Sequence, residues 1–138
     1  MEFDGLIPFA PGCPISSIGE VAQEFDLHND GEIREFNVDF RDKFVRLIWR
    51  IKQPAWQVPE QPETWQRKTI GGLSLIFSDV HLVTTSGAFF ETAGANELDF
   101  LEYTPSARNL GETRIVFGGS AEVVVLCSKC QLRTTELP

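Results

Sequence analysis

The chain has 138 residues, of which 42% are hydrophobic and 23% charged, and its formal net charge is −8. This length suits one globular domain, which can bury enough surface to fold without a disulfide or a metal. With 12 basic against 20 acidic residues and no basic cluster, the sequence argues against binding to nucleic acids or anionic membranes, because both require concentrated positive charge.

The sequence carries no pattern typical of membrane insertion or secretion. No apolar run approaches the length of a membrane span, and the first four residues are acidic where a signal peptide would be basic and then apolar. The three cysteines are an odd number without the spacing of a disulfide framework. We therefore expect a cytoplasmic protein with reduced thiols and no membrane contact.

The N-terminal part predicts an irregular arm followed by one helix. Three prolines within residues 1–14 indicate the arm. A helix is predicted over residues 17–28, where Ser17 and Glu20 match a capping box and Asn29-Asp30-Gly31 is a stop signal, because Asn and Gly tolerate positive φ. Its apolar face is formed by residues at helical spacing, namely Ile18, Val21, Ala22 and Phe25.

A β-hairpin is predicted over residues 35–51, where apolar and polar residues alternate along both strands. A tight turn at Asp42-Lys43 would set Asp39 opposite Arg46 and Glu35 opposite Arg50. Such opposed charges stabilise a strand pair by roughly 0.2–1 kcal/mol. The apolar pairs predicted by the same register are Phe40–Val45, Val38–Leu47 and Phe36–Trp49.

A long loop is predicted over residues 53–68, since its three prolines cannot donate to a strand ladder. Trp56 and Trp65 in this loop are candidate partner-binding or ligand-binding residues, because long loops often bind and tryptophan is enriched at binding hot spots. The alternative is that both indoles fold back and plug the open end of the sheet. We expect Trp65 to be buried against the sheet and Trp56 to be more accessible.

Further strands are predicted in the second half of the chain. One begins at Leu73, and its apolar phase shifts at Ser78-Asp79, which indicates a bulge or a tight turn. Leu98 and Phe100 mark another strand before Pro105.

The last predicted hairpin joins residues 113–117 to residues 121–127. Gly118-Gly119-Ser120 provides a three-residue loop that places Ile115 opposite Val123. With turn signals this frequent, we expect six to eight antiparallel strands over residues 33–135. The chain is therefore predicted to be a single domain over 1–138 of α+β, sheet-dominated class, with one N-terminal helix and a β-sandwich or an incomplete barrel.

The residues that could carry chemistry do not form a recognisable site. Cys127 and Cys130 would need a second pair of ligands to hold structural zinc, and Cys127 is better interpreted as a small buried hydrophobe. The two cysteines are expected near the end of a strand, with their sulfur atoms on opposite faces. Neither His28 nor His81 has a nucleophile near it in sequence. We expect no catalytic residue, no metal and no cofactor.

Three strand-like segments resemble small β-rich immunity proteins of bacterial polymorphic-toxin systems in their pattern and order. They are residues 31–38, residues 73–80 with the pattern Leu-x-Leu-x-Phe-x-x-Val, and residues 121–127, which end in a cysteine. The resemblance spans about residues 31–130. It implies a non-enzymatic protein that binds and blocks one toxin, and it assigns no role to individual residues.

We therefore expect a non-enzymatic binding protein with a protein partner. The alternative is a small-molecule-binding domain that holds an apolar ligand among the phenylalanines of a concave sheet face, and a third option is an enzyme that uses carboxylates in such a cavity. An enclosed pocket of roughly 300 Å³ or more with converging polar groups would favour the alternatives. A filled core would favour partner binding. The sequence leaves open whether the chain forms a homodimer.

Overall fold

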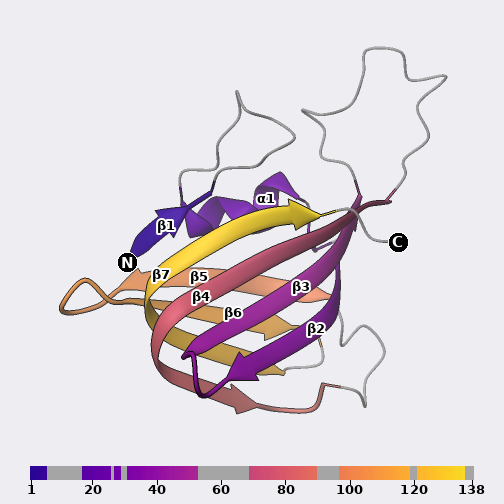
Figure 1. The fold of residues 1–138 in the computed structure, drawn as a ribbon. Helices are drawn as coiled ribbons and strands as arrows, with labels where there is room; N and C mark the ends of the chain where they lie inside the picture. Colours follow the sequence, from indigo (N-terminus) through magenta and orange to yellow (C-terminus); the bar gives the residue numbers. More distant parts are fainter. Residues whose placement is uncertain are drawn as a thin grey trace, which may run out of the picture.

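The computed structural model describes residues 1–5, 17–25, 27–28, 31–52, 69–89, 97–118 and 121–135. In these ranges seven strands form one sheet in the order β2-β3-β4-β7-β6-β5, with β1 beside β7 (Figure 1). Neighbours along this path are antiparallel, whereas β1 runs parallel to β7. The strands are β1 Glu2–Asp4, β2 Glu32–Asp39, β3 Phe44–Lys52, β4 Thr69–Ser86, β5 Leu98–Pro105, β6 Gly111–Phe117 and β7 Glu122–Thr135.

The predicted sheet-dominated, antiparallel fold with six to eight strands is confirmed. A sandwich or a barrel is not confirmed, because the seven described strands belong to one open sheet. In the described residues the end strands β2 and β5 each pair with a single neighbour. No helix in the described ranges is long and apolar enough to cross a membrane.

The helical segment is shorter than predicted. A 3₁₀ turn, η1 (Ile18–Glu20), leads into α1 (Val21–Glu24), in place of a helix over 17–28. The predicted capping box is wrong, because the Ser17 side chain makes no capping hydrogen bond and its carbonyl oxygen accepts the Glu20 N–H at 3.2 Å instead. This i→i+3 bond is the 3₁₀ pattern. The predicted apolar face is confirmed, since all four of its residues are buried.

Gly31 is required for a reason other than the predicted one. Gly87 is the glycine with positive φ in the described ranges, so Gly31 does not adopt the left-handed conformation. A Cβ added at Gly31 would instead lie 2.9 Å from the Cα of Leu27 and 2.6 Å from its Cδ2. The chain therefore needs glycine here to pass close to Leu27. Asn29 and Asp30 lie outside the described residues.

The β2–β3 hairpin has the predicted inward-facing residues except Phe40, which is exposed, and it has a different register. Val38, not Phe40, pairs with Val45, so the residues of β2 from Glu35 to Asp39 pair two positions away from their predicted partners. Beyond the bulge between Ile33 and Glu35, Trp49 and Arg50 pair three positions away from theirs. The cause is the turn, which runs from Phe40 to Lys43 and ends with Lys43 at φ 53°. The remaining pairs that differ from the prediction are Phe36–Leu47, Ile33–Trp49, Asn37–Arg46, Glu35–Ile48 and Glu32–Arg50.

The predicted charge pairs of this hairpin are wrong as a consequence. Asp39 lies opposite Phe44, and its Oδ1 accepts the backbone N–H of Asp42 at 2.7 Å, so its carboxylate stabilises the turn. Arg46 lies opposite Asn37.

The prediction of an irregular arm over residues 1–14 is wrong for the first residues, which include a short strand. Glu2–Asp4 forms β1 along the part of β7 that β6 leaves free, because β6 pairs with β7 only as far as Cys127. The Nη2 atom of Arg133 on β7 lies 2.7 Å from Oδ2 of Asp4, which adds an ion pair to this short ladder. The prolines of the predicted arm lie outside the described residues.

The strands predicted in the second half are confirmed. β5 contains Leu98 and Phe100 and ends at Pro105. In the last hairpin Ile115 pairs with Val123, and the Phe117 N–H donates to the Ala121 carbonyl at 2.8 Å, as a three-residue connection requires.

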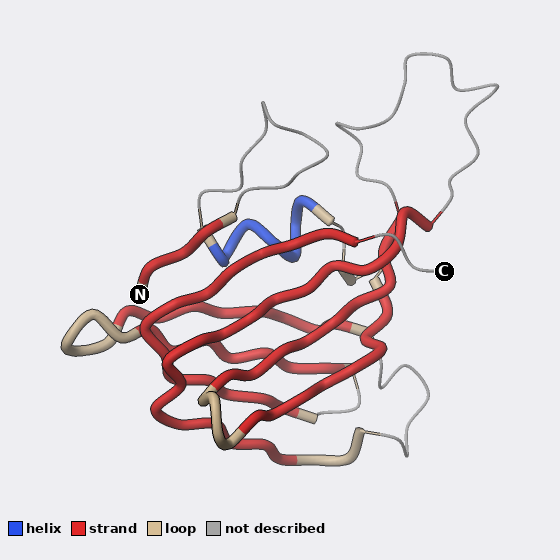
Figure 2. The backbone as a smooth tube through the Cα atoms, viewed as in Figure 1, coloured by secondary structure: helices blue, strands red, loops and turns tan. Residues whose placement is uncertain are grey.

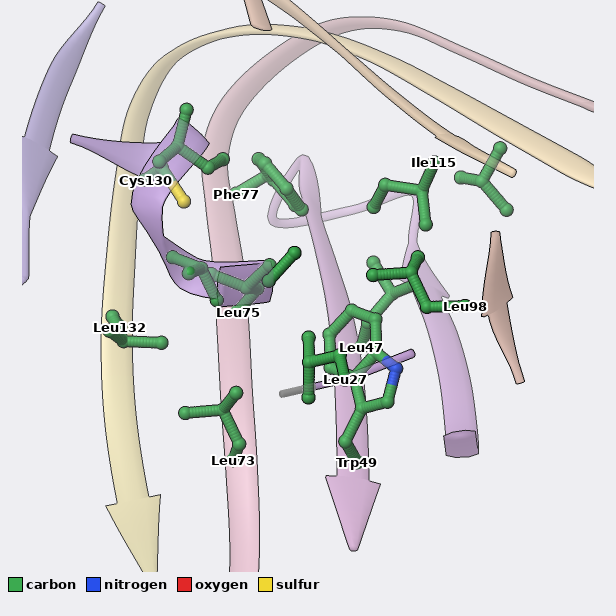
Figure 3. Close-up of a cluster of buried hydrophobic side chains, with 14 of the residues drawn as sticks. Leu27, Leu47, Trp49, Leu73, Leu75, Phe77, Leu98, Ile115, Cys130 and Leu132 are labelled. Carbon is green, nitrogen blue, oxygen red and sulfur yellow. The ribbon is translucent and has the colours of Figure 1, made fainter. Parts of the chain in front are cut away.

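One continuous core lies where the sheet curves over itself, so that β5 and β6 come to lie behind β3 and β4 (Figure 1). The short helical segment lies along one margin of the sheet (Figure 2). Figure 3 shows Leu27 from the N-terminal segment and Leu98 from β5 beside Trp49 and Leu47 of β3. Because Trp49, Phe77 and Phe117 are at most 1% exposed, the described part of the concave face is filled by side chains.

Candidate functional site

The candidate site is produced by β4, which is longer than its neighbour β3. Pairing between the two ends at Val45 and Phe77, but β4 continues to Ser86 along β7. The Lys43 carbonyl accepts the Val80 N–H at 3.0 Å, which joins the hairpin turn to β4. Beyond it β4 curves away beneath β2 (Figure 1).

A bulge causes this divergence, as the phase shift in the sequence predicted. The β4–β7 register shifts between Val80 and Leu82, so His81 is the extra residue, and Asp79 adopts φ 50°. A bulge bends its strand and increases the local twist. The shift lies just after the predicted Ser78-Asp79 position.

The hollow between the hairpin and the outer half of β4 is called the notch here. It has a volume of about 470 Å³ and is open to solvent at the surface. Phe40 is 87% exposed and Leu82 is 52% exposed, while Val38 and Val80 pack against the core from beneath. The notch is lined by Val38, Asp39, Phe40, Lys43, Phe44, Val45, Asp79, Val80, His81, Leu82 and Val83.

Polar groups gather at the closed end of the notch around Asp79. The Ser128 hydroxyl donates to Asp79 Oδ2 at 2.6 Å, and Nε2 of His81 lies 3.6 Å from the same oxygen. The Ser128 hydrogen bond, followed by the charges of His81 and Lys43, lowers the pKa of Asp79 despite some desolvation. The carboxylate is therefore ionised at neutral pH.

This cluster does not have the order of a nucleophilic triad. In a triad the histidine lies between the serine and the carboxylate, so that it can take the hydroxyl proton. Here Asp79 lies between Ser128 and His81 and accepts the serine hydrogen itself. The arrangement holds the bulge in place and presents one negative charge to the notch.

The two C-terminal cysteines lie in the core. β7 runs through both of them to Thr135, so the prediction that the pair lies near the end of a strand is wrong. Both side chains are buried, because the inward phase of β7 shifts opposite the β4 bulge. Desolvation raises the pKa of Cys127 to about 11, against a weaker effect of the Lys129 backbone, and burial also raises the pKa of Cys130.

Raised pKa values make both thiols poor nucleophiles and poor metal ligands, since the thiolate is the reactive form. The Cys127 Sγ lies 3.6 Å from Sδ of Met1, a contact consistent with a small buried hydrophobe. Among the described residues, no group of three or more His, Cys, Asp or Glu side chains could hold a metal ion. His28 lies apart from the notch, with Nδ1 3.0 Å from the Leu98 carbonyl.

The predicted binding residues Trp56 and Trp65 lie outside the described residues, so their role stays a prediction. Sequence reasoning missed the exposed aromatic side chain of Phe40, because the predicted register placed it opposite Val45. A signal was present: Asp42-Lys43 is not a favoured two-residue turn, and a longer turn would have freed Phe40 from the ladder.

Compared with known proteins, the sequence matches no family model, and no curated protein matches it. The chemistry of the notch therefore has to be considered directly. It combines an apolar floor and two exposed apolar side chains with charged groups at one end. Such a surface can bind apolar side chains of a partner while its charged groups pair with polar side chains beside them. Among the described residues around the notch, no base is placed to activate the Ser128 hydroxyl through a histidine.

Proposed function

We propose that this is a non-enzymatic protein that binds a protein partner through the notch, as an immunity protein binds the toxin that it blocks. The observation that carries the proposal is the exposure of Phe40 and Leu82 on either side of an apolar hollow. Aromatic residues are enriched at interface hot spots, and adjoining exposed apolar side chains mark interaction sites. The order of the segments that resemble immunity proteins supports the same class of function.

The charge of the chain supports a basic partner. The net charge of −8 would attract a cationic protein and speed its association at low salt. Asp79 adds a fixed negative charge at the notch, since its pKa is lowered. Binding in the cytoplasm agrees with the reduced, buried cysteines.

Binding of a small apolar ligand is the second candidate, because the notch volume of about 470 Å³ lies in the range of ligand pockets. The support for it is weaker for two reasons. The notch is open to solvent, whereas ligand pockets bury most of the ligand surface. The concave face that the sequence analysis considered as a ligand cavity is filled in its described part by side chains such as Trp49 and Phe25.

The test uses the full chain and the product of the gene adjacent to its own. We expect the two proteins to form a complex, and Phe40→Ala and Leu82→Ala each to weaken it about tenfold or more. The matched control is Phe100→Ala, which removes an exposed aromatic residue of β5 that lies beneath Arg114 and outside the notch. The control should change the dissociation constant by less than about twofold.

Three results would contradict the proposal. The first is failure of the adjacent gene product to bind. A complex that all three variants weaken equally would place the interface elsewhere. Saturable binding of an apolar dye such as ANS that Phe40→Ala abolishes, without a protein complex, would support the small-molecule candidate instead.

A further inference from the structure

Apart from the outer edge of the three-residue β1 and the last residues of β7, three strand edges in the described part of the chain have no strand partner. They are the outer edges of β2 and β5, and the notch side of β4 beyond Val80. A free edge presents unpaired N–H and C=O groups, and proteins usually protect such edges with charges, proline or bulges. The three edges differ in this protection.

The edges of β2 and β5 are protected. β2 has a bulge between Ile33 and Glu35, and Arg34 at that bulge pairs with Glu32 at 3.4 Å. β5 carries Asp99 and Glu102 and ends in Pro105. Both edges therefore carry features that discourage a further strand.

The part of β4 that follows the bulge at His81, from Leu82 to Ser86, lacks these features. Its sequence from Leu82 to Ser86 is Leu-Val-Thr-Thr-Ser, with no charge and no proline, and it is rich in residues that favour strands. These residues pair with β7 on one side only, from Leu126 to Glu122. Leu82, Thr84, Thr85 and Ser86 are all exposed. This is an accessible edge of about five residues.

Two contacts with the hairpin bound this edge of β4. At one end the Lys43–Val80 hydrogen bond joins the hairpin turn to β4. At the other end Phe36 of β2 stacks on Phe89, which follows β4, with ring centroids 6.4 Å apart. A strand added to this edge would lie about 4.7–4.9 Å from β4, roughly half the diameter of a helix, so an extended segment needs less room between these two contacts than a helix does.

We propose that the partner adds an extended segment as a new strand on the β4 edge at Leu82–Ser86, with apolar side chains at alternate positions facing the notch. This inference rests on the proposed function and specifies how the partner is recognised. Main-chain pairing would supply affinity, and contact with Phe40 and Leu82 would select the side chains.

The inserted segment is cationic. Acidic side chains outnumber basic ones around the notch. Among the residues that line it, Asp39 and Asp79 are acidic and Lys43 is basic, and His81 lies beside Asp79. Residues of the segment that point away from the notch floor would carry the positive charge, because side chains of a strand alternate between its faces.

The first experiment uses a capped heptapeptide of alternating Val and Lys as the probe, with fluorescence anisotropy as the readout. Two further versions carry N-methyl groups on one or the other alternating set of backbone amides. We expect the parent peptide and one methylated version to bind, and the other version to lose at least about tenfold in affinity, because one set of amides faces β4. Bound peptide should slow amide hydrogen exchange within residues 82–86.

The second experiment compares Thr84→Lys with Thr104→Lys, which adds the same charge to the exposed edge of β5. Thr84→Lys should weaken binding of the peptide and of the adjacent gene product about tenfold, and Thr104→Lys should change either by less than about twofold. The Phe40→Ala result separates the two proposals: a partner that is sensitive to Phe40→Ala but not to Thr84→Lys uses the notch without strand addition.

Several outcomes would overturn the inference. They are failure of the parent peptide to bind, equal binding of both methylated versions, and slowed exchange at β2 or β5 instead of β4. A dimer of the free chain that Thr84→Lys dissociates would show that a second copy, and not a partner segment, occupies this edge.

Discussion

Gly31 and Leu27 lie so close together that any side chain at position 31 would clash with Leu27. The atom nearest to a new Cβ that cannot move away is the Cα of Leu27, at 2.9 Å. Leu27 is itself fully buried, so it has no open space into which it can shift. Gly19 differs, because a Cβ there would meet nothing nearer than the Ser17 hydroxyl at 4.0 Å.

We expect Gly31→Ala to lower the free energy of unfolding by about 1–3 kcal/mol, the usual cost of overpacking. The matched control, Gly19→Ala, should leave it unchanged or raise it by up to about 1 kcal/mol, because alanine restricts the unfolded chain. Urea denaturation followed by tryptophan fluorescence measures both. Equal effects of the two substitutions would show that close approach to Leu27 is not the constraint.

The buried thiol of Cys127 links stability to alkaline pH. Its pKa rises from the ordinary 9.0 to about 11 in the folded chain, because burial disfavours the thiolate. Below pH 9 the thiol is protonated in both folded and unfolded chains. Between pH 9 and 11 the unfolded chain releases the proton while the folded chain retains it, so stability falls as the pH rises.

We therefore expect the free energy of unfolding to fall between pH 9 and pH 10.5, and to fall less steeply in Cys127→Ala. Urea midpoints at four pH values in this range, at constant ionic strength, provide the measurement. The Cys127→Ala chain will be less stable at every pH, so the slopes and not the absolute values are compared. Parallel slopes would mean that Cys127 does not contribute to the pH dependence.

The β2–β3 hairpin illustrates which features of an element local sequence determines. Alternation correctly identified the inward residues Val38, Val45 and Leu47, because the side-chain period of a strand is two. Register depends on turn geometry as well, and a shift by two residues keeps every side chain on its predicted face. The alternation therefore could not distinguish the predicted register from the observed one. The last hairpin was predicted correctly because its glycine-rich connection indicated the loop length.

The turn of this hairpin depends on the Asp39 side chain as a hydrogen-bond acceptor. We expect Asp39→Ala to lower the free energy of unfolding by about 1 kcal/mol, because the Asp42 N–H loses its partner. Asp39→Asn keeps an acceptor oxygen and should cost less than about 0.5 kcal/mol. Suppose instead that the two substitutions were equally costly, and that neither lowered the free energy of unfolding in a chain that already carries Arg46→Ala. Asp39 would then act through an ion pair with Arg46.

The N-terminal segment packs against the curved sheet and completes the hydrophobic core. Phe25 and Leu27 belong to the same core cluster as residues from β3, β4, β5, β6 and β7. Both residues follow α1, which has only four residues, so the stability of this helix has to come from burial and not from helix propensity.

Two phenylalanines, one in the core and one on the surface, test the assignment of buried and exposed side chains. Phe25 is 2% exposed and Phe40 is 87% exposed. We expect Phe25→Ala to lower the free energy of unfolding by about 3–5 kcal/mol and Phe40→Ala by less than about 0.5 kcal/mol. Thermal and urea denaturation of the two variants check this. A large loss for Phe40→Ala would show that its side chain packs in the free protein and is not available to a partner.

The sequence by itself determined which residues of β3 and of the first half of β4 face the core, the number of strands within narrow limits, the bulge in β4 and the loop length of the last hairpin. These properties are local, because burial imposes a period of two on a strand and turns select their own residues. The tertiary structure alone decided that β1 would run parallel to β7, that both cysteines would be buried and that β4 would extend past β3. Such features depend on which edges remain free once distant segments have paired, and no local pattern encodes them. The notch is one of these features, because it exists only where the longer strand continues beyond its neighbour.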